Sequence, residues 1–178
     1  MSKSMRISAI FTALILIAAA FCGCGYKIGN LGHPQLKSVA VAPVVNDTLA
    51  YNAAANLRGL LNETFQTDGT LKLTGMNKAD CIVYARITSV GFSEISWGSR
   101  DNANGTNSFT PNQWLVKLAV EYSVIIPGRA LPLLQAQQVT ATAEFMSGPD
   151  IEISRNYAIK QACFVAAKKI VSEITEAW

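Results

Sequence analysis

The sequence predicts an α+β fold: a mostly antiparallel sheet with two helices packed on one face, in the order strand, helix, strands, helix. Two long segments repeat apolar residues every three or four positions, which indicates helices that bury one side. Three other segments alternate apolar and polar residues, which is typical of strands with one buried face. Pro127 and Gly128 suit the centre of a type II turn, so two of these strands are predicted to form a hairpin.

The first strand and the first helix are predicted from residues 38–69. Residues 38–45 are rich in valine and alanine, which indicates a mostly buried strand. Asn46-Asp47-Thr48 ends this strand with side chains that turn the backbone or cap a helix. In the helix that follows, Asp68-Gly69 supplies the end, because glycine adopts the left-handed conformation. The apolar stripe of this helix is predicted at Ala53, Leu57, Leu60, Leu61 and Thr64.

Three strands and a long helix are predicted to complete the domain. The strands cover residues 79–93, 114–126 and 133–145, and the helix covers residues 154–177. Each strand places its apolar residues on one side, so one face of the sheet is expected to join the core under both helices. The other face is polar, and we expect it to be exposed or to meet a partner.

Residues 94–112 are predicted as a long loop between two of these strands. The tip, residues 98–107, consists almost entirely of small and polar residues. Loops of this length in compact domains are either functional or disordered. Trp97, Phe109 and Trp114 flank the tip, which favours a loop that docks on another surface over a flexible connection.

The first 23 residues have the layout of an export signal. Lys3 and Arg6 precede an apolar run over residues 7–21, which would form a helix about 22 Å long at ~1.5 Å per residue. Such a helix is shorter than the ~30 Å hydrocarbon core of a bilayer. We therefore expect a signal peptide over residues 1–23, and we expect no second membrane span because no later run holds 18 apolar residues.

The end of this segment resembles the site at which bacterial lipoproteins are acylated and cleaved. Cys24 follows the small residue Gly23, whereas Cys22 follows the bulky Phe21, so Cys24 is the expected lipidated residue. Ordinary secretion, or retention of the signal as an anchor, is the alternative. By the same resemblance, Gly25 in place of an aspartate indicates the outer membrane. Residues 24–36 are expected to form a tether, and residues 37–178 a single domain.

Two cysteines remain after the signal, and export would place them where disulfides persist. Cys81 lies in a predicted strand and Cys163 in a predicted helix, both on the inward face. A bridge between them and two buried free thiols are both open, because cysteine also packs as a small apolar residue.

The sequence holds little that predicts catalysis, and we expect no enzyme, metal or cofactor. His33 is the sole histidine and lies in the expected tether, so neither a histidine triad nor a multi-histidine metal site can form. Asp80 and Glu121 are single carboxylates, expected to be structural or solvated. Loss of residues 1–23 would leave 13 basic against 12 acidic residues, from 15 against 12, which is too balanced for general nucleic-acid binding.

Several features together resemble the LptE family of lipopolysaccharide-assembly lipoproteins. They are the lipid site Cys24-Gly25-Tyr26, the strand and turn over residues 39–48, Ala79-Asp80 at the start of a strand, and the terminal helix. The similarity covers almost the whole chain after the signal. It implies an outer-membrane lipoprotein, facing the periplasm, that plugs and stabilises an LptD-type β-barrel and assists lipopolysaccharide assembly.

The resemblance implies lipopolysaccharide as a ligand, for which Arg100 and Arg129 are candidate contacts because guanidinium groups match phosphate geometry. Solvated surface charge is the alternative interpretation of both residues. A different class of function is the alternative: an envelope lipoprotein that activates a periplasmic cell-wall synthase or serves in a secretion assembly.

Overall fold

A computed structural model describes residues 36–101 and 107–176 of the chain. The predicted signal peptide 1–23, nearly all of the tether 24–36, Cys24 and His33 lie outside the described residues, as do the centre of the 98–107 tip and the last two residues. The chain order of the elements is β1 (Ser38–Val41), β2 (Val45–Asn46), α2 (Ala53–Asp68), β3 (Lys72–Leu73), β4 (Cys81–Asp101), β5 (Asn107–Ile125), β6 (Leu134–Met146) and α3 (Ile151–Glu176).

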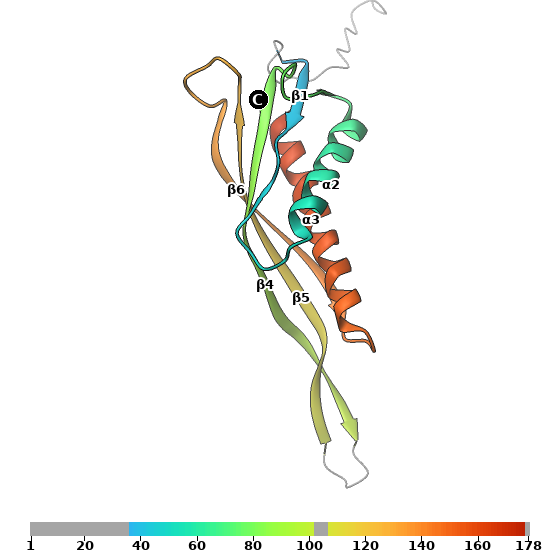
Figure 1. Cartoon of the computed structure of the whole chain (residues 1–178). Coiled ribbons are helices and arrows are strands. Elements are labelled where there is room, and N and C mark those ends of the chain that lie inside the picture. Colours follow the sequence, from blue (N-terminus) through green and yellow to red (C-terminus); the bar gives the residue numbers. More distant parts are fainter. Residues whose placement is uncertain (1–35, 102–106, 177–178) are drawn as a thin grey trace, which may run out of the picture.

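The strands form one six-stranded sheet in the order β3-β1-β4-β5-β6, with β2 also paired to β4. Strands β4, β5 and β6 are antiparallel neighbours, whereas β1 and β2 run parallel to β4. The predicted 38–45 strand is thus divided into two short strands, with Pro43 between them, because proline has no N–H to donate to a ladder. Both helices lie on one face of the sheet (Figure 1), which confirms the predicted fold class.

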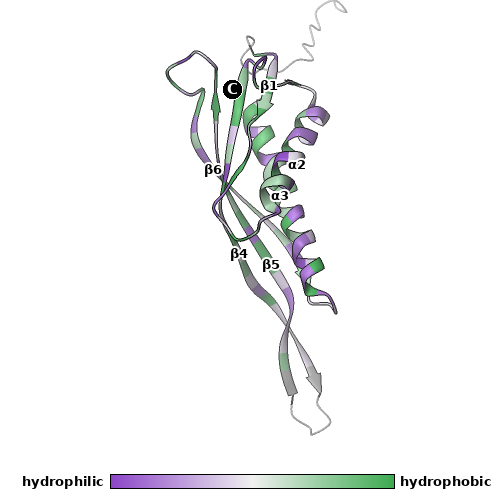
Figure 2. Ribbon diagram, viewed as in Figure 1, coloured by the Kyte–Doolittle hydropathy of each residue, from purple (hydrophilic) through white to green (hydrophobic). Residues whose placement is uncertain are grey.

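The core lies between this sheet face and the two helices. The strand residues predicted to face inward are buried, from Cys81, Val83 and Ile87 in β4 to Val139 in β6, except Trp114 of β5, which is partly buried. Figure 2 shows the resulting alternation of hydrophobic and hydrophilic residues along the strands. The stripe of α2 ends on Phe65, which is fully buried, and not on Thr64 as predicted, because position i+4 from Leu61 returns to the same helix face.

The helix ends and the hairpin turn follow the predicted residues closely. Helix α2 ends at Gly69, whose φ is 70° and whose N–H donates to Phe65 O. Helix α3 begins three residues before the predicted start, and Asp150 Oδ1 accepts a hydrogen bond of 3.2 Å from Ile153 N there. In the β5–β6 turn Gly128 has φ 84°, and Arg129 N donates to Ile126 O over 3.1 Å.

The prediction of a loop over residues 94–112 is wrong. Strand β4 continues to Asp101 and β5 starts at Asn107, so the segment is a two-stranded ribbon with the register Trp97↔Pro111 and Ser99↔Phe109. We call residues 95–101 and 107–112 the arm. The arm projects beyond the helices and the end of β6 (Figure 1). Small polar side chains do not prevent pairing, because the ladder uses backbone groups.

Candidate interaction surfaces

The base of the arm is fixed to the body by one residue after β6. Ser147 N donates to Asn112 O and Ser147 Oγ donates to Pro111 O, each over 2.9 Å. Trp114 Nε1 donates to the same Ser147 Oγ over 2.9 Å, and its ring stacks on Phe145 with centroids 6.4 Å apart. These contacts hold Pro111, Asn112 and Trp114 of β5 at the junction of the arm and the body, so the direction of the arm is set where it leaves the sheet.

Large apolar side chains of the arm are exposed. Trp97 is 56% exposed, Phe109 is 66% exposed and Ile95 is 43% exposed. Ser99 pairs with Phe109 and lies two residues after Trp97, so Trp97 and Phe109 share one face of the ribbon. The sequence predicts that this segment docks on another surface. In the structure the segment is a pair of strands with Trp97 and Phe109 on one face.

The sheet face opposite the helices carries polar residues in its middle rows, whereas Tyr84 and Ile125 are exposed on the same face nearer β1. Arg86, Glu121 and Gln138 are paired across β4, β5 and β6 and form one row on this face. Lys117 and Thr142 form a second paired row, and all five side chains belong to exposed residues. The helices do not cover this face (Figure 1), so in the described structure a set of charged and hydrogen-bonding groups remains open to water or to a partner.

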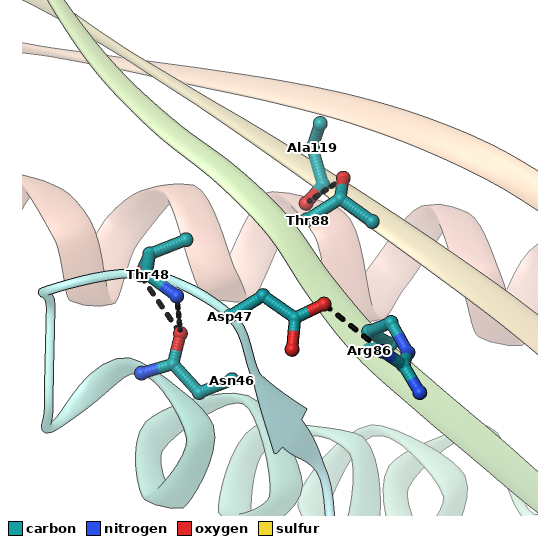
Figure 3. A network of polar contacts seen from close by, with 6 residues as sticks. All are labelled: Asn46, Asp47, Thr48, Arg86, Thr88 and Ala119. Atoms are coloured by element: carbon teal, nitrogen blue, oxygen red, sulfur yellow. Dashed lines mark hydrogen bonds and ion pairs between the residues drawn. The ribbon is translucent and has the colours of Figure 1, made fainter.

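The loop between β2 and α2 is held by polar contacts, which Figure 3 shows. Asn46 Oδ1 accepts from Thr48 N over 3.1 Å and from Thr48 Oγ1 over 2.8 Å, and Asn46 Nδ2 donates to Ala50 O over 2.9 Å. Asp47 Oδ2 accepts from Arg86 Nη1 of β4 over 3.0 Å. The Asn46-Asp47-Thr48 turn therefore orders the chain ahead of α2, whereas Asn52, the N-cap residue, makes no side-chain cap bond.

A cavity of about 440 Å³ lies beside this loop, between the first turns of α2 and α3 and strand β4. Its walls include Tyr51, Asn56, Phe92 and Arg155. The Arg155 guanidinium lies 5.1 Å from the Phe92 ring centroid and pairs with Glu152 over 2.8 Å. The sequence did not point to this cavity, because its lining comes from separate segments with no shared spacing.

Cys81 and Cys163 are both buried free thiols in the structure. Cys81 Sγ donates to Ser38 O over 3.5 Å, and Cys163 Sγ donates to Ala53 O over 3.8 Å. Burial raises the pKa of Cys81 to about 11, with a smaller contribution from the nearby Asp80 charge, and raises the pKa of Cys163 to about 12. We therefore expect these thiols to be unreactive near neutral pH.

The two candidate lipopolysaccharide contacts lie far apart. Arg100 pairs with Ser108 in the arm, whereas Arg129 lies in the exposed β5–β6 turn at the other end of β5. The strand between residues 108 and 126 corresponds to about 60 Å at ~3.4 Å per residue. They cannot contact one phosphate group together.

The two single carboxylates, Asp80 and Glu121, lie in different surroundings. Asp80 Oδ2 accepts hydrogen bonds from Lys37 N, Ser38 N and Ser38 Oγ at 2.8 to 3.0 Å, and these bonds, led by the one from Lys37, lower the pKa of Asp80. Glu121 lies on the open sheet face. Over residues 36–101 and 107–176, no group of three His, Cys, Asp or Glu residues could hold a metal, and no helix is long and apolar enough to cross a membrane.

No protein-family model and no curated protein sequence matches the chain. Solved structures are similar in fold. Lipoprotein B of Nitrosomonas europaea, described as uncharacterized, aligns with a TM-score of 0.53 at 13% identity over 86% of this chain and 90% of its own. A protein of Caulobacter crescentus described as a candidate lipoprotein aligns with a TM-score of 0.52 at 11% identity over 77% and 87%.

A third solved structure is an assembly of identical chains. PelC of Paraburkholderia phytofirmans, described as a dodecamer, aligns with a TM-score of 0.50 at 13% identity over 83% of this chain and 95% of its own. At these identities the likeness extends to the fold alone. The chain thus has a fold that proteins described as lipoproteins also have.

Proposed function

We propose that this chain is a lipoprotein anchored to the outer membrane through Cys24, which plugs an LptD-type β-barrel and assists lipopolysaccharide assembly. The observation that carries the proposal is the polar sheet face opposite the helices, with its rows Arg86-Glu121-Gln138 and Lys117-Thr142. The interior of an outer-membrane barrel is polar and wet, so it suits this face. The resemblance of the sequence to the LptE family, and the lipoprotein fold, support the same function.

The proposed role is not catalytic. The side chains described above bind, pair and pack, and the lone carboxylates hold the backbone or lie on the open face. A plug acts by filling a lumen and supporting the folding of its barrel. Both require a stable, self-contained domain, which the single core between the sheet and helices provides.

Affinity purification of the tagged full-length protein from outer membranes tests the partner. The expected result is co-purification of one large β-barrel in equal amount. Recovery of a cell-wall synthase, or of no barrel, would overturn the proposal. Recovery of a homo-oligomer of this chain without a barrel would favour the second candidate, a secretion-assembly component; PelC, which has a similar fold, is described as a dodecamer.

The lipid anchor has its own test. A Cys24→Ser variant is expected to be released from envelopes in soluble form, because two or more acyl chains are needed for stable attachment. A Cys22→Ser variant is the matched control and is expected to stay in the membrane fraction. Equal membrane retention of both variants would exclude Cys24 as the anchor.

Arg100 and Arg129 are separate candidate contacts for lipopolysaccharide phosphates under this proposal. Charge reversal of each residue alone is expected to weaken lipopolysaccharide binding, since each would contact its own phosphate. Lys72→Glu, an exposed position of β3, is the control. Unchanged binding and unchanged surface lipopolysaccharide in both arginine variants would remove these residues from the site.

A further inference from the structure

Apart from the hydrogen bonds of Ser147 to Pro111 O and Asn112 O at its base, the arm has no strand or helix packed on it within the described residues. Strand β6 ends its pairing with β5 at Gln113↔Met146, and β2 ends its pairing with β4 at Asn46↔Ile87. Beyond these points, in the part of the chain that the structure describes, β4 and β5 pair only with each other. Two-stranded ribbons are at best marginally stable in water, so an arm of this length gains stability from a surface that covers it.

The arm has the composition of a contact surface that does not depend on charge. Arg100 and Asp101 are its only charged residues, and the others are small and polar apart from Ile95, Trp97, Phe109 and Pro111. Trp97 and Phe109 share one ribbon face and are both more than half exposed. Exposed aromatic side chains surrounded by hydrogen-bonding groups are typical of the anchors in protein interfaces.

We infer that the Trp97 and Phe109 face of the arm is a docking surface for a partner protein of the envelope, with apolar pockets for the two rings and polar groups for the ribbon edges. The identity of that partner as the β-barrel rests on the proposed function. A lipid surface fits less well, because the outer backbone edges of the arm would have unsatisfied N–H and C=O groups in hydrocarbon. Polar groups on the surface of a protein partner can hydrogen-bond to these backbone groups.

The arm lies far from β1, the first strand of the described chain. Strand β1, to which the tether leads, pairs with the first residues of β4, whereas the arm is formed by the last residues of β4. The span from residue 81 to residue 101 corresponds to about 65 Å along the strand at ~3.3 Å per residue. The arm and the start of β1 lie at opposite ends of the molecule (Figure 1). The arm therefore contacts the partner at the end of the domain away from β1.

Photo-crosslinking in native envelopes tests this contact directly. A benzophenone amino acid at position 97 or 109 of the full-length protein is expected to give a covalent adduct with one protein, identified by mass spectrometry. The yield is expected to be unchanged between low and high salt, because the arm carries almost no charge. Adducts with phospholipid in place of protein, or no adduct at either position, would overturn the inference.

The Trp97→Ser/Phe109→Ser double variant supplies a second readout. Its thermal midpoint is expected to match the wild type, since both side chains lie outside the core, whereas partner recovery is expected to fall at least tenfold. Leu131→Ser is the matched control, because Leu131 is 75% exposed but lies beyond the β5–β6 turn at the other end of β5. The Leu131→Ser variant is expected to recover the partner in an amount within twofold of the wild type. Wild-type recovery by the double variant would overturn the inference.

The failures of the two proposals are distinguishable. If the wild type captures a barrel, but positions 97 and 109 give no protein adduct and the double variant also captures the barrel, the docking surface fails and the proposed function stands. If the arm crosslinks to another envelope protein and no barrel is recovered, the proposed function fails and the docking surface stands.

Discussion

The side chains of Tyr122 and Glu173 join the sheet to the longer helix, since Tyr122 Oη of β5 donates a hydrogen bond to Glu173 Oε2 of α3. Tyr122 is almost fully buried, whereas Glu173 is an exposed residue. Burial, and then the bond to Glu173, raises the pKa of Tyr122 above its ordinary value. The pair fixes the end of α3 on β5, a contact that hydrophobic spacing alone does not specify.

A Tyr122→Phe variant is expected to lose about 1 to 2 kcal/mol of unfolding free energy, because a buried hydrogen bond to a charged group is removed while Glu173 regains water. Its stability should also depend less on alkaline pH. In the wild type, the unfolded tyrosine deprotonates above about pH 10 while the folded one keeps its proton, so stability falls as pH rises. Urea unfolding at pH 7 and pH 10.5 measures both effects. Tyr157→Phe, at a 70% exposed position, is the control; equal midpoints for the two variants would contradict the prediction.

Thiol counting is expected to give two free thiols per mature chain in denaturant, from Cys81 and Cys163. In the folded protein at pH 7 neither should react, because burial raises the pKa of these thiols to about 11 and about 12. A thiol reagent with and without denaturant, followed by mass spectrometry, measures both counts. No reactive thiol in denaturant would demonstrate a bridge, and a third one would show that Cys24 is unmodified.

The sequence predicts elements well where one face is buried and poorly where neither face is. Val116, Leu118 and Val120 alternate with polar or small residues because one side of β5 packs under α3, and this alternation located the strand. In the arm no helix covers either face, so strand formation requires no alternation of apolar residues, and the polar residues of 98–107 have the pattern of a loop. Strand formation there follows from backbone pairing between β4 and β5.

Contacts between residues that are far apart in the sequence cannot be predicted from local sequence patterns. Phe92 and Arg155 meet at the cavity from β4 and α3, more than sixty positions apart, and neither lies in a recognisable motif. By contrast, the sequence does predict a contact role for Trp97 and Phe109, because these aromatic residues flank a small, polar segment. Their common face became visible only with the register of β4 and β5.

An Asn46→Ala variant is expected to lose about 1 to 2 kcal/mol of unfolding free energy, because three hydrogen bonds that order the turn before α2 are removed. Asn52→Ala is the matched control. Asn52 makes no side-chain cap bond, so its replacement is expected to cost less than about 0.5 kcal/mol. Chemical denaturation of both variants measures the difference. A larger loss for Asn52→Ala would show that Asn52 caps the helix in solution.

An Asp80→Asn variant is expected to have a lower thermal midpoint at neutral pH and a flatter response to acid. The hydrogen bond from Lys37 N and those from Ser38 lower the pKa of Asp80 in the folded protein. The carboxylate therefore contributes stability above about pH 4, and this contribution is lost as the pH falls through the folded pKa. Thermal unfolding from pH 7 to pH 3 measures this. Glu63→Gln, at an exposed position of α2, should keep the wild-type profile; identical profiles for both variants would contradict the assignment.

Replacing two glycines by alanine is expected to change stability in opposite directions. Gly128 has φ 84° in the hairpin turn, where a Cβ costs about 1 kcal/mol through backbone strain. Gly59 lies within α2, and a Cβ there would meet no atom within 4 Å, so alanine should stabilise the helix by about 0.5 to 1 kcal/mol. Denaturant midpoints of Gly128→Ala and Gly59→Ala, measured side by side, check both signs. A stabilising Gly128→Ala would mean that the turn relaxes to a conformation with negative φ, and the β5–β6 hairpin would then lack the turn described here.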